Sequence, residues 1–220
     1  MRPAFVVPFV LFAVPVLAAD TVTARTPQFE ATIVNGTLAG LEADGVQMVA
    51  PSEGTLTGIL RVGKDHFVAP ADVGSASVAA GRPVRRTYRD LSELPGSVLT
   101  NEYSLADGDL VLTQQATSPE PGVHGVQWGL GLVPLEYNVL VPGNGGVRLK
   151  RDSPGSSFQF DYPIGWEAQL VILEGAGHGF CVWAEDAVGR YKRLTIRKQQ
   201  NGWQLGFTTL YLVISDLPSN

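Results

Sequence analysis

The sequence has one cysteine, few charged residues for its length, and no apolar run beyond its N-terminus that is long enough to cross a membrane. One thiol cannot form an internal disulfide, so a core of buried side chains must supply the stability. Cys181 lies between Phe180 and Val182 with no neighbouring base that would favour a reactive thiolate. We therefore predict that Cys181 is a buried structural residue.

Positive charge is also scarce, and it forms no continuous run. The formal net charge is −5, and the densest basic group is Arg82, Arg85, Arg86 and Arg89. A nucleic-acid-binding protein normally carries a basic stripe, because phosphate neutralisation supplies most of its affinity. We predict that the arginine group is a solvated loop face, and we exclude nucleic acid as a partner.

The motifs of several catalytic and cofactor-binding classes are absent. No Gly-x-Ser-x-Gly elbow occurs, and Gly143–Gly146 is not followed by the Lys-Ser/Thr pair of a phosphate-binding loop. The histidines, His66, His124 and His178, lie far apart in the sequence without metal-ligand spacing. We expect each to be a loop or cap residue, and we expect neither a metal nor a cofactor.

The N-terminal 18 residues have the features of a cleavable export signal. Arg2 is followed by an apolar run of about fourteen residues that contains two prolines, and Val16–Ala18 fits a small-x-small cleavage site. A membrane span needs about 20 apolar residues. The expectation is a signal peptide over 1–18, a mature chain from Ala19, no later membrane span, and a secreted or periplasmic location. A non-cleaved anchor is the alternative.

The rest of the chain predicts an all-β fold. Glycine (25) and proline (15) are frequent, and helical periodicity is missing beyond the signal. Hairpin signals recur along the chain, at Asn35-Gly36, Asp44-Gly45, Asp107-Gly108 and Asn201-Gly202. Glycines around Trp128 suggest a bulge or a close backbone approach. About fifteen short strands without a linker predict one domain over 19–220, a large antiparallel sandwich of two packed, twisted sheets.

The most informative stretch extends from Phe158 to Arg193. It predicts two strands, Ala168–Glu174 and Gly179–Glu185, joined by a glycine-rich turn over 175–178 and preceded by a polar-aromatic loop. Sugars pack their C–H faces on aromatic rings, and their hydroxyls bond to polar side chains. Loops held on a rigid sheet often carry binding residues. We therefore predict carbohydrate contacts by four residues of this region, namely Asp161, Tyr162, Trp166 and Gln169.

Two qualifications belong to that prediction. A large aromatic side chain in such a loop is also suited to capping the core, so this role stays open for Tyr162 and Trp166. The other three tryptophans, Trp128, Trp183 and Trp203, lie within strands and are expected in the core.

Glycosidase chemistry requires two carboxyl groups that face each other across the scissile bond. The candidates are Asp161, Glu167, Glu174, Glu185 and Asp186. Nothing in the sequence shows that two of them converge, and Glu185-Asp186 is expected to be a solvated turn. No catalytic residue is predicted.

Three motifs carry a resemblance to a known domain type. They are Tyr162-Pro163…Trp166-Glu167-Ala168-Gln169, then Gly179–Asp186, then Tyr191-Lys192, and the opening Phe29…Gly36–Leu41 is similar as well. Together they resemble the galactose-mutarotase-like β-supersandwich at the N-terminus of certain glycoside hydrolases, relatives of endo-α-N-acetylgalactosaminidases and α-galactosidases. The likeness covers Phe29–Thr209.

The resemblance implies a noncatalytic domain of a secreted glycoside hydrolase, with carbohydrate as a ligand. It also implies a catalytic (β/α)8 barrel as a partner domain, expected C-terminal to this chain. A stand-alone carbohydrate-binding module and an aldose-epimerase-like enzyme are the alternatives. The histidine pair and glutamate of an aldose epimerase cannot be placed on His66, His124 or His178.

Overall fold

The computed structural model describes residues 19–61, 64–68, 74–91, 93–119, 123–143, 145–185 and 191–210. These residues form strands, turns and loops without a helix, so the all-β prediction is confirmed. The expected signal segment, 1–18, lies outside the described residues. Within the described ranges there is accordingly no helix with the length and apolar character of a membrane span.

Among the described residues, the largest of three sheets has eleven strands, ordered β14-β17-β18-β11-β3-β2-β1-β7 along its main path. Off this path, β4 pairs with β3, β5 pairs with β11, and β6 pairs with β5. Its strands are β1 (Thr21–Arg25), β2 (Glu30–Val34), β3 (Thr37–Ala43), β4 (Val46–Val49), β5 (Gly58–Arg61), β6 (Lys64–Phe67), β7 (Ser75–Val78), β11 (Val123–Val133), β14 (Ser157–Tyr162), β17 (Lys192–Lys198) and β18 (Trp203–Leu210).

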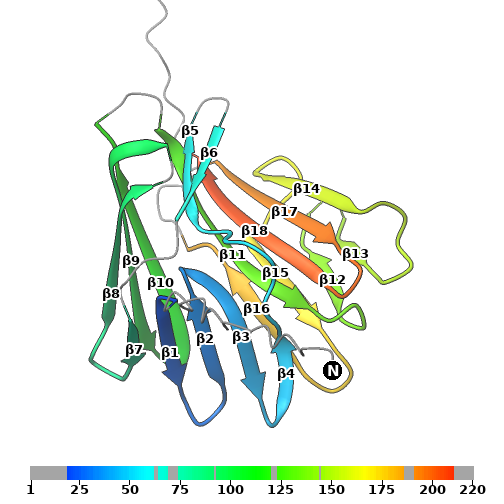
Figure 1. Ribbon diagram of the computed structural model, residues 1–220. Helices are drawn as coiled ribbons and strands as arrows, with labels where there is room; N and C mark the ends of the chain where they lie inside the picture. Colours follow the sequence, from blue (N-terminus) through cyan, green and yellow to red (C-terminus); the bar gives the residue numbers. More distant parts are fainter. Residues whose placement is uncertain are drawn as a thin grey trace, which may run out of the picture.

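Two smaller sheets complete the fold. A three-stranded sheet, ordered β10-β9-β8, consists of β8 (Val84–Leu91), β9 (Leu94–Ala106) and β10 (Asp109–Thr117). A four-stranded sheet, ordered β13-β12-β15-β16, consists of β12 (Asn138–Val141), β13 (Val147–Leu149), β15 (Leu170–Glu174) and β16 (Gly179–Trp183). In Figure 1 the three-stranded sheet stands at the left of the view, and β12 and β13 of the four-stranded sheet lie at the right.

The expectation of a large antiparallel fold of two sheets is wrong in detail. Hydrogen bonding divides the strands into three sheets, and two pairs are parallel: β1 with β7, and β11 with β3. Long connections separate the parallel partners in the sequence, so no local hairpin signal marks them. Neither smaller sheet forms backbone pairs with the large sheet through the described residues, so each is a separate sheet.

The turn predictions are confirmed where the chain needs a left-handed backbone. Asn35 and Gly36 have φ of 47° and 76°, and Asp107 and Gly108 have φ of 53° and 92°. Asparagine, aspartate and glycine tolerate such angles, which match the twist of a hairpin. The bulge expected around Trp128 is also present, because the β11–β18 register shifts between Leu130 and Leu132.

Buried side chains tie the smaller sheets to the large one in two clusters. The first joins the large sheet to the four-stranded sheet, through residues such as Leu194 and Trp203 on one side and Val139 and Val171 on the other. The second cluster brings β5 and β11 together with β8 and β9, and it consists of Ile59, Val68, Tyr88, Leu91, Leu94, Leu99 and Val126. The core therefore lies between layers, as in a sandwich.

A buried polar group also links the three-stranded sheet to the start of β1. The Asp20 side chain is 1% exposed, and its Oδ2 accepts a 2.6 Å hydrogen bond from the Tyr88 hydroxyl. Its Oδ1 lies 2.9 Å from Arg86 Nε as an ion pair, although neither atom makes an aligned hydrogen bond. Burial raises the pKa of Tyr88 well above its usual range, and the interaction with Tyr103 and the hydrogen bond to Asp20 raise it further. The Tyr88 hydroxyl therefore remains a donor.

This arrangement corrects the prediction for the arginine group. Arg85, Arg86 and Arg89 belong to strand β8 rather than to a loop. The side chain of Arg86 is 13% exposed and pairs with Asp20 between the layers. A strand alternates its faces, so one member of a basic group can point into the core while its neighbours point to solvent.

Candidate functional site

The predicted carbohydrate loop begins at the end of edge strand β14, which pairs with β17. Asp161 lies opposite Arg193, and Tyr162 lies opposite Lys192. Successive residues of a strand point to opposite faces of the sheet. Asp161 and Tyr162 are therefore neighbours in sequence that project from opposite faces of β14.

Asp161 is held on its face by a basic partner. Arg193 Nε donates a 2.8 Å hydrogen bond to its Oδ1, and Gln159 Nε2 donates a 3.1 Å bond to its Oδ2. Desolvation would raise the pKa of Asp161, but the hydrogen bonds from Arg193, Tyr191 and Gln159, with the Arg193 charge, lower it overall. A carboxylate with a lowered pKa is unsuited to donate a proton as a general acid at neutral pH.

Tyr162 packs against the first core cluster instead of standing free in solvent. Its ring is half-buried, and Lys192 Nζ lies 5.1 Å from the ring centroid. Lys192 is only 2% exposed. A cation over an aromatic face is a favourable contact, so one face of the Tyr162 ring is already occupied.

Trp166 is fully buried, at 0% exposure, and its Nε1 donates a 2.8 Å hydrogen bond to the Leu170 carbonyl. The Glu167 N–H donates to the Pro142 carbonyl at 2.9 Å, and a Cβ at Gly143 would collide with the Gly165 carbonyl oxygen. The loop is thus pressed onto the strand connection beside it. This geometry fits the core-capping alternative for Trp166, because the indole has no exposed face for a sugar.

Gln169 has a positive φ of 52° and lies between the loop and β15. Its backbone carbonyl accepts a 2.9 Å hydrogen bond from the Ala184 N–H, and its side-chain Oε1 is buried without a hydrogen-bond partner. The four predicted contact residues are therefore close in sequence but do not present one shared surface.

Trp183 is an exposed aromatic side chain of this region, so the prediction of a core position is wrong for it. It is 55% exposed at the end of β16 and lies opposite Leu170 of β15. Cys181, two residues before it, is exposed as well, so the prediction of a buried cysteine is also wrong. Ile172 faces Cys181 across the ladder and is 39% exposed. We call the outward side of β15 and β16, with Leu170, Ile172, Cys181 and Trp183, the Trp183 face.

A polar group borders this face toward β12 and β13. Arg148 forms an ion pair with Glu174, and Asn138 Nδ2 donates a 3.3 Å hydrogen bond to Glu174 Oε2. The hydrogen bonds from Arg148 and Asn138 lower the pKa of Glu174. Glu174 lies opposite Gly179, at the other end of the β15–β16 ladder from Trp183, about 13 Å along the strand. Guanidinium, amide and carboxylate groups at that distance can bind the hydroxyl groups of an extended ligand whose apolar side rests on the ring.

The other two tryptophans predicted in the core, Trp203 and Trp128, lie in it or beside it. Trp203 is fully buried, and its Nε1 donates a 3.0 Å hydrogen bond to the Tyr137 carbonyl. Trp128 is half-buried, with its ring 5.7 Å from that of Phe207. The prediction of core positions is thus confirmed for Trp203, and Trp128 packs beside the core.

The histidines and the remaining carboxylates form no catalytic constellation among the described residues. His66 is buried in strand β6, so the prediction of a loop or cap position is wrong for it. His178 is exposed in the β15–β16 turn, and its ring makes an edge-to-face contact with that of Tyr137, with the ring centroids 5.6 Å apart. The His124 side chain and Asp186 lie outside the described residues. Within the described part of the chain, no three His, Cys, Asp or Glu side chains converge as metal ligands.

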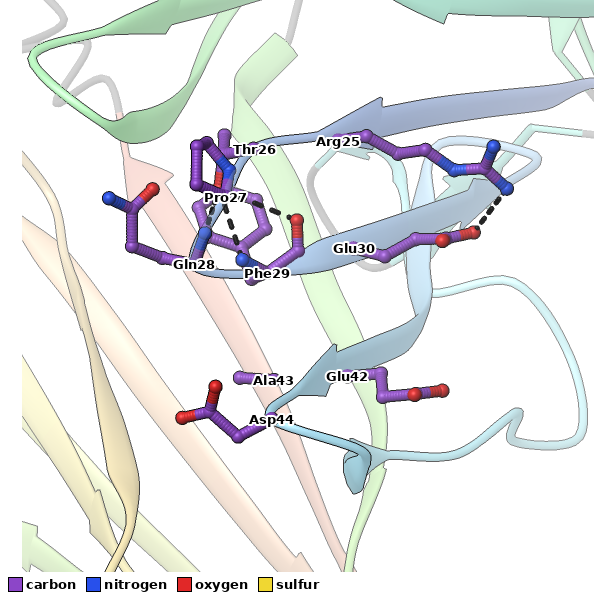
Figure 2. A pocket seen from close by; sticks show the side chains of 9 residues that line it. All are labelled: Arg25, Thr26, Pro27, Gln28, Phe29, Glu30, Glu42, Ala43 and Asp44. Atoms are coloured by element: carbon purple, nitrogen blue, oxygen red, sulfur yellow. Dashed lines mark hydrogen bonds and ion pairs between the residues drawn. The ribbon is translucent and has the colours of Figure 1, made fainter.

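A shallow pocket of about 220 Å³ lies elsewhere, between the tip of the β1–β2 hairpin and the β3–β4 turn (Figure 2). The Thr26 hydroxyl accepts hydrogen bonds from the Gln28 and Phe29 N–H groups, and Arg25 pairs with Glu30. Glu42 lies directly opposite Glu30 on β3. The pocket is lined by turn residues and carboxylates and shares no residue with the Trp183 face.

Comparison with protein-family models and with curated proteins found no match to this chain. The structure itself defines an all-β domain of sandwich-like layers that carries an exposed aromatic and apolar face on its four-stranded sheet.

Proposed function

We propose that this chain is a noncatalytic β-sandwich domain of a secreted carbohydrate-active protein and that it contacts carbohydrate through the Trp183 face. The observation that carries the proposal is the 55% exposure of Trp183 on a hydrogen-bonded strand. A large exposed indole on a rigid element gives a flat apolar platform at little conformational cost.

The surroundings of Trp183 suit a ligand that is apolar on one side and rich in hydroxyls at its rim. Leu170 and Ile172 extend the apolar area on the neighbouring strand, and the Arg148–Glu174 pair supplies charged hydrogen-bonding groups at the far end of β15, about 13 Å along the strand. An apolar surface with polar groups at its border suits an extended ligand. The sequence resemblance to domains of glycoside hydrolases points to a sugar as that ligand.

The same resemblance makes a catalytic barrel the proposed partner domain. In that arrangement the sandwich supports the barrel, and the barrel carries the catalytic carboxylates. Among the described residues, Asp161 and Glu174 each form an ion pair with an arginine, and each has a lowered pKa. A carboxyl group with a lowered pKa suits a binding role better than acid catalysis. A stand-alone carbohydrate-binding module is the second candidate, and it relies on the same face.

The test is a glycan-array screen of the purified chain, followed by calorimetry on the sugars that bind. We expect Trp183→Ala to weaken binding at least tenfold, because loss of a central aromatic contact typically costs more than about 1.4 kcal/mol. Trp183→Phe should retain part of the affinity because a ring remains. Val111→Ala is the matched control, since Val111 is an exposed apolar residue on the separate three-stranded sheet.

Equal binding by the wild type and Trp183→Ala would refute the assignment of the site. Absence of binding to every glycan would refute the carbohydrate role of this chain. Turnover of a free reducing sugar, lost on replacement of His124 or His178, would instead favour the aldose-epimerase-like alternative.

A further inference from the structure

Strand β16 is an edge of its sheet within the described part of the chain. It pairs with β15 on one side, and no other described strand pairs with it. Its sequence, Gly179–Trp183, contains no charged residue and no proline. Natural edge strands are usually protected by charges, prolines or bulges, because an unprotected edge offers a template for another strand. The edge of β16 has none of these protections.

The backbone direction shows which groups that edge offers. Gly175 N–H donates to the His178 carbonyl, and Ala184 N–H donates to the Gln169 carbonyl, so the backbone groups of His178 and Ala184 point toward β15. In an antiparallel strand, this direction alternates from residue to residue. The N–H and C=O groups of Gly179, Cys181 and Trp183 therefore point away from β15, along the open edge.

We propose that a second copy of this chain binds to this edge, with the two β16 strands antiparallel about a twofold axis at Cys181. Cys181 then lies opposite Cys181 of the second copy and exchanges both backbone hydrogen bonds with it. Gly179 and Trp183 pair reciprocally in the same way, at the Cα separation of about 5.5 Å that is usual for such pairs. Most soluble homo-oligomers use an interface of this self-complementary kind.

The residues of β16 complement themselves in this register. Gly179 has no side chain, and it faces Trp183 of the second copy, so the bulky indole meets an open position. An aromatic residue across from an edge glycine is a favourable cross-strand pair. Phe180 faces Val182, an aromatic and β-branched pair of the type that stabilises sheets.

The absence of charge on β16 also suits a second copy as the occupant. The strand is neutral, so pairing with itself brings no like charges together. In this register Glu185 lies opposite Gly177 of the second copy and His178 lies opposite Ala184, so the ends of the pair place no two like charges opposite each other.

The dimer would join two four-stranded sheets into one continuous sheet. Residues directly opposite on paired strands project from the same face, so both Trp183 side chains lie on one side of the joined sheet. The two Cα atoms are separated by four residues of strand, about 14 Å. A repeating polymer could then contact both copies, which would raise its apparent affinity. The pairing itself does not depend on sugar binding.

Sedimentation velocity on charge variants at Cys181 tests the proposal. Cys181→Lys and Cys181→Glu each place two like charges directly opposite at the axis, and we expect each variant alone to be monomeric. An equimolar mixture of the two should regain the dimer, because lysine then faces glutamate. Cys181→Ser is the matched control and should remain dimeric. In the wild type, a short bismaleimide should link the two Cys181 thiols by addition.

Each result decides the matter. A monomeric wild type, or a Cys181→Lys variant that still dimerises, would overturn the proposed pairing. Failure of the lysine–glutamate mixture to dimerise would overturn the twofold register. Binding of an extended peptide or a catalytic domain to a monomeric wild type would identify a different occupant and overturn the second-copy assignment. Glycan binding is measured separately on wild-type protein diluted until it is monomeric, because Cys181 belongs to the Trp183 face and a charge there would alter that face.

Discussion

The buried Asp20 carboxylate predicts a large and specific loss of stability when its charge is removed. Asp20→Asn keeps the shape of the side chain but leaves Arg86 without its ion-pair partner and weakens the bond from the Tyr88 hydroxyl. Removal of one partner from a buried pair costs about 3–5 kcal/mol. Because Arg86 is 13% exposed and its Nη2 also donates a 3.3 Å hydrogen bond to the Gly74 carbonyl, the orphaned charge keeps part of its stabilisation. We therefore expect a decrease of about 3 kcal/mol in the free energy of unfolding.

Removal of the Tyr88 hydroxyl is a second test of the Asp20 interaction. Tyr88→Phe removes a hydrogen bond to a charged acceptor, which is worth about 1.5–3 kcal/mol. The double variant with Asp20→Asn should lose less than the sum of the two, because both changes affect the same bond. Tyr103→Phe is the control: its buried hydroxyl accepts a 3.0 Å bond from Asn101, a neutral partner, and its loss should cost about 1 kcal/mol.

The assay is urea unfolding followed by fluorescence and circular dichroism, with the free energy obtained by linear extrapolation. A loss below about 1 kcal/mol in Asp20→Asn, or strictly additive losses in the double variant, would refute a buried, coupled network at this position.

Two further predictions concern the loop after β14. The pKa of Asp161 is lowered from 3.8 in the folded chain, so its ion pair with Arg193 stabilises the fold above that pH, and this contribution is lost as the pH falls through the folded-state value. Since both groups are partly exposed, Asp161→Asn should cost about 0.5 kcal/mol at neutral pH and progressively less in acid; a pH-independent difference in urea unfolding would contradict this. Gly143→Ala should cost about 2 kcal/mol, because its Cβ would meet the backbone of the loop, and should lower the melting temperature by about 4–8 °C. In the control, Gly206→Ala, the Cβ meets only the end of a glutamine side chain at 3.5 Å, and an equal loss in both variants would show that steric contact is not the cause.

The sequence was most informative where local chemistry alone decides the structure. Asn35-Gly36 and Asp107-Gly108 adopt left-handed angles that few other residue pairs tolerate, and the hairpins follow directly. The pairing of distant strands has no such signal. The parallel partners β1 and β7 are joined in register by Thr21 opposite Ser75, two residues that are compatible with many other neighbours. The division into three sheets was therefore beyond local prediction.

The candidate site could not be predicted in full, because its make-up depends on the face of the sheet from which each side chain projects. Asp161 and Tyr162 were grouped because they are adjacent, yet an extended strand separates adjacent side chains by its pleat. The loop position of Trp166 is compatible with either a ligand contact or a core-capping role, and the loop folds back onto the core. The sequence shows that aromatic residues are concentrated in this region. It does not show which way their side chains point.

Trp183 escaped prediction for a reason that also bears on function. Val171 and Leu173 point into the core, but Leu170 and Ile172, on the opposite face of β15, are apolar too, so the usual alternation that marks an exposed face is missing. A strand that is apolar on both faces is typical of a sheet that is covered on both sides. Here the described residues leave the outer face exposed, with Trp183 at its edge. The composition of β15 and β16 is thus better explained by a face that a sugar or a partner domain covers than by one that remains in water, and the glycan-binding experiment tests the first of these. Pairing of two copies at the β16 edge leaves this face open.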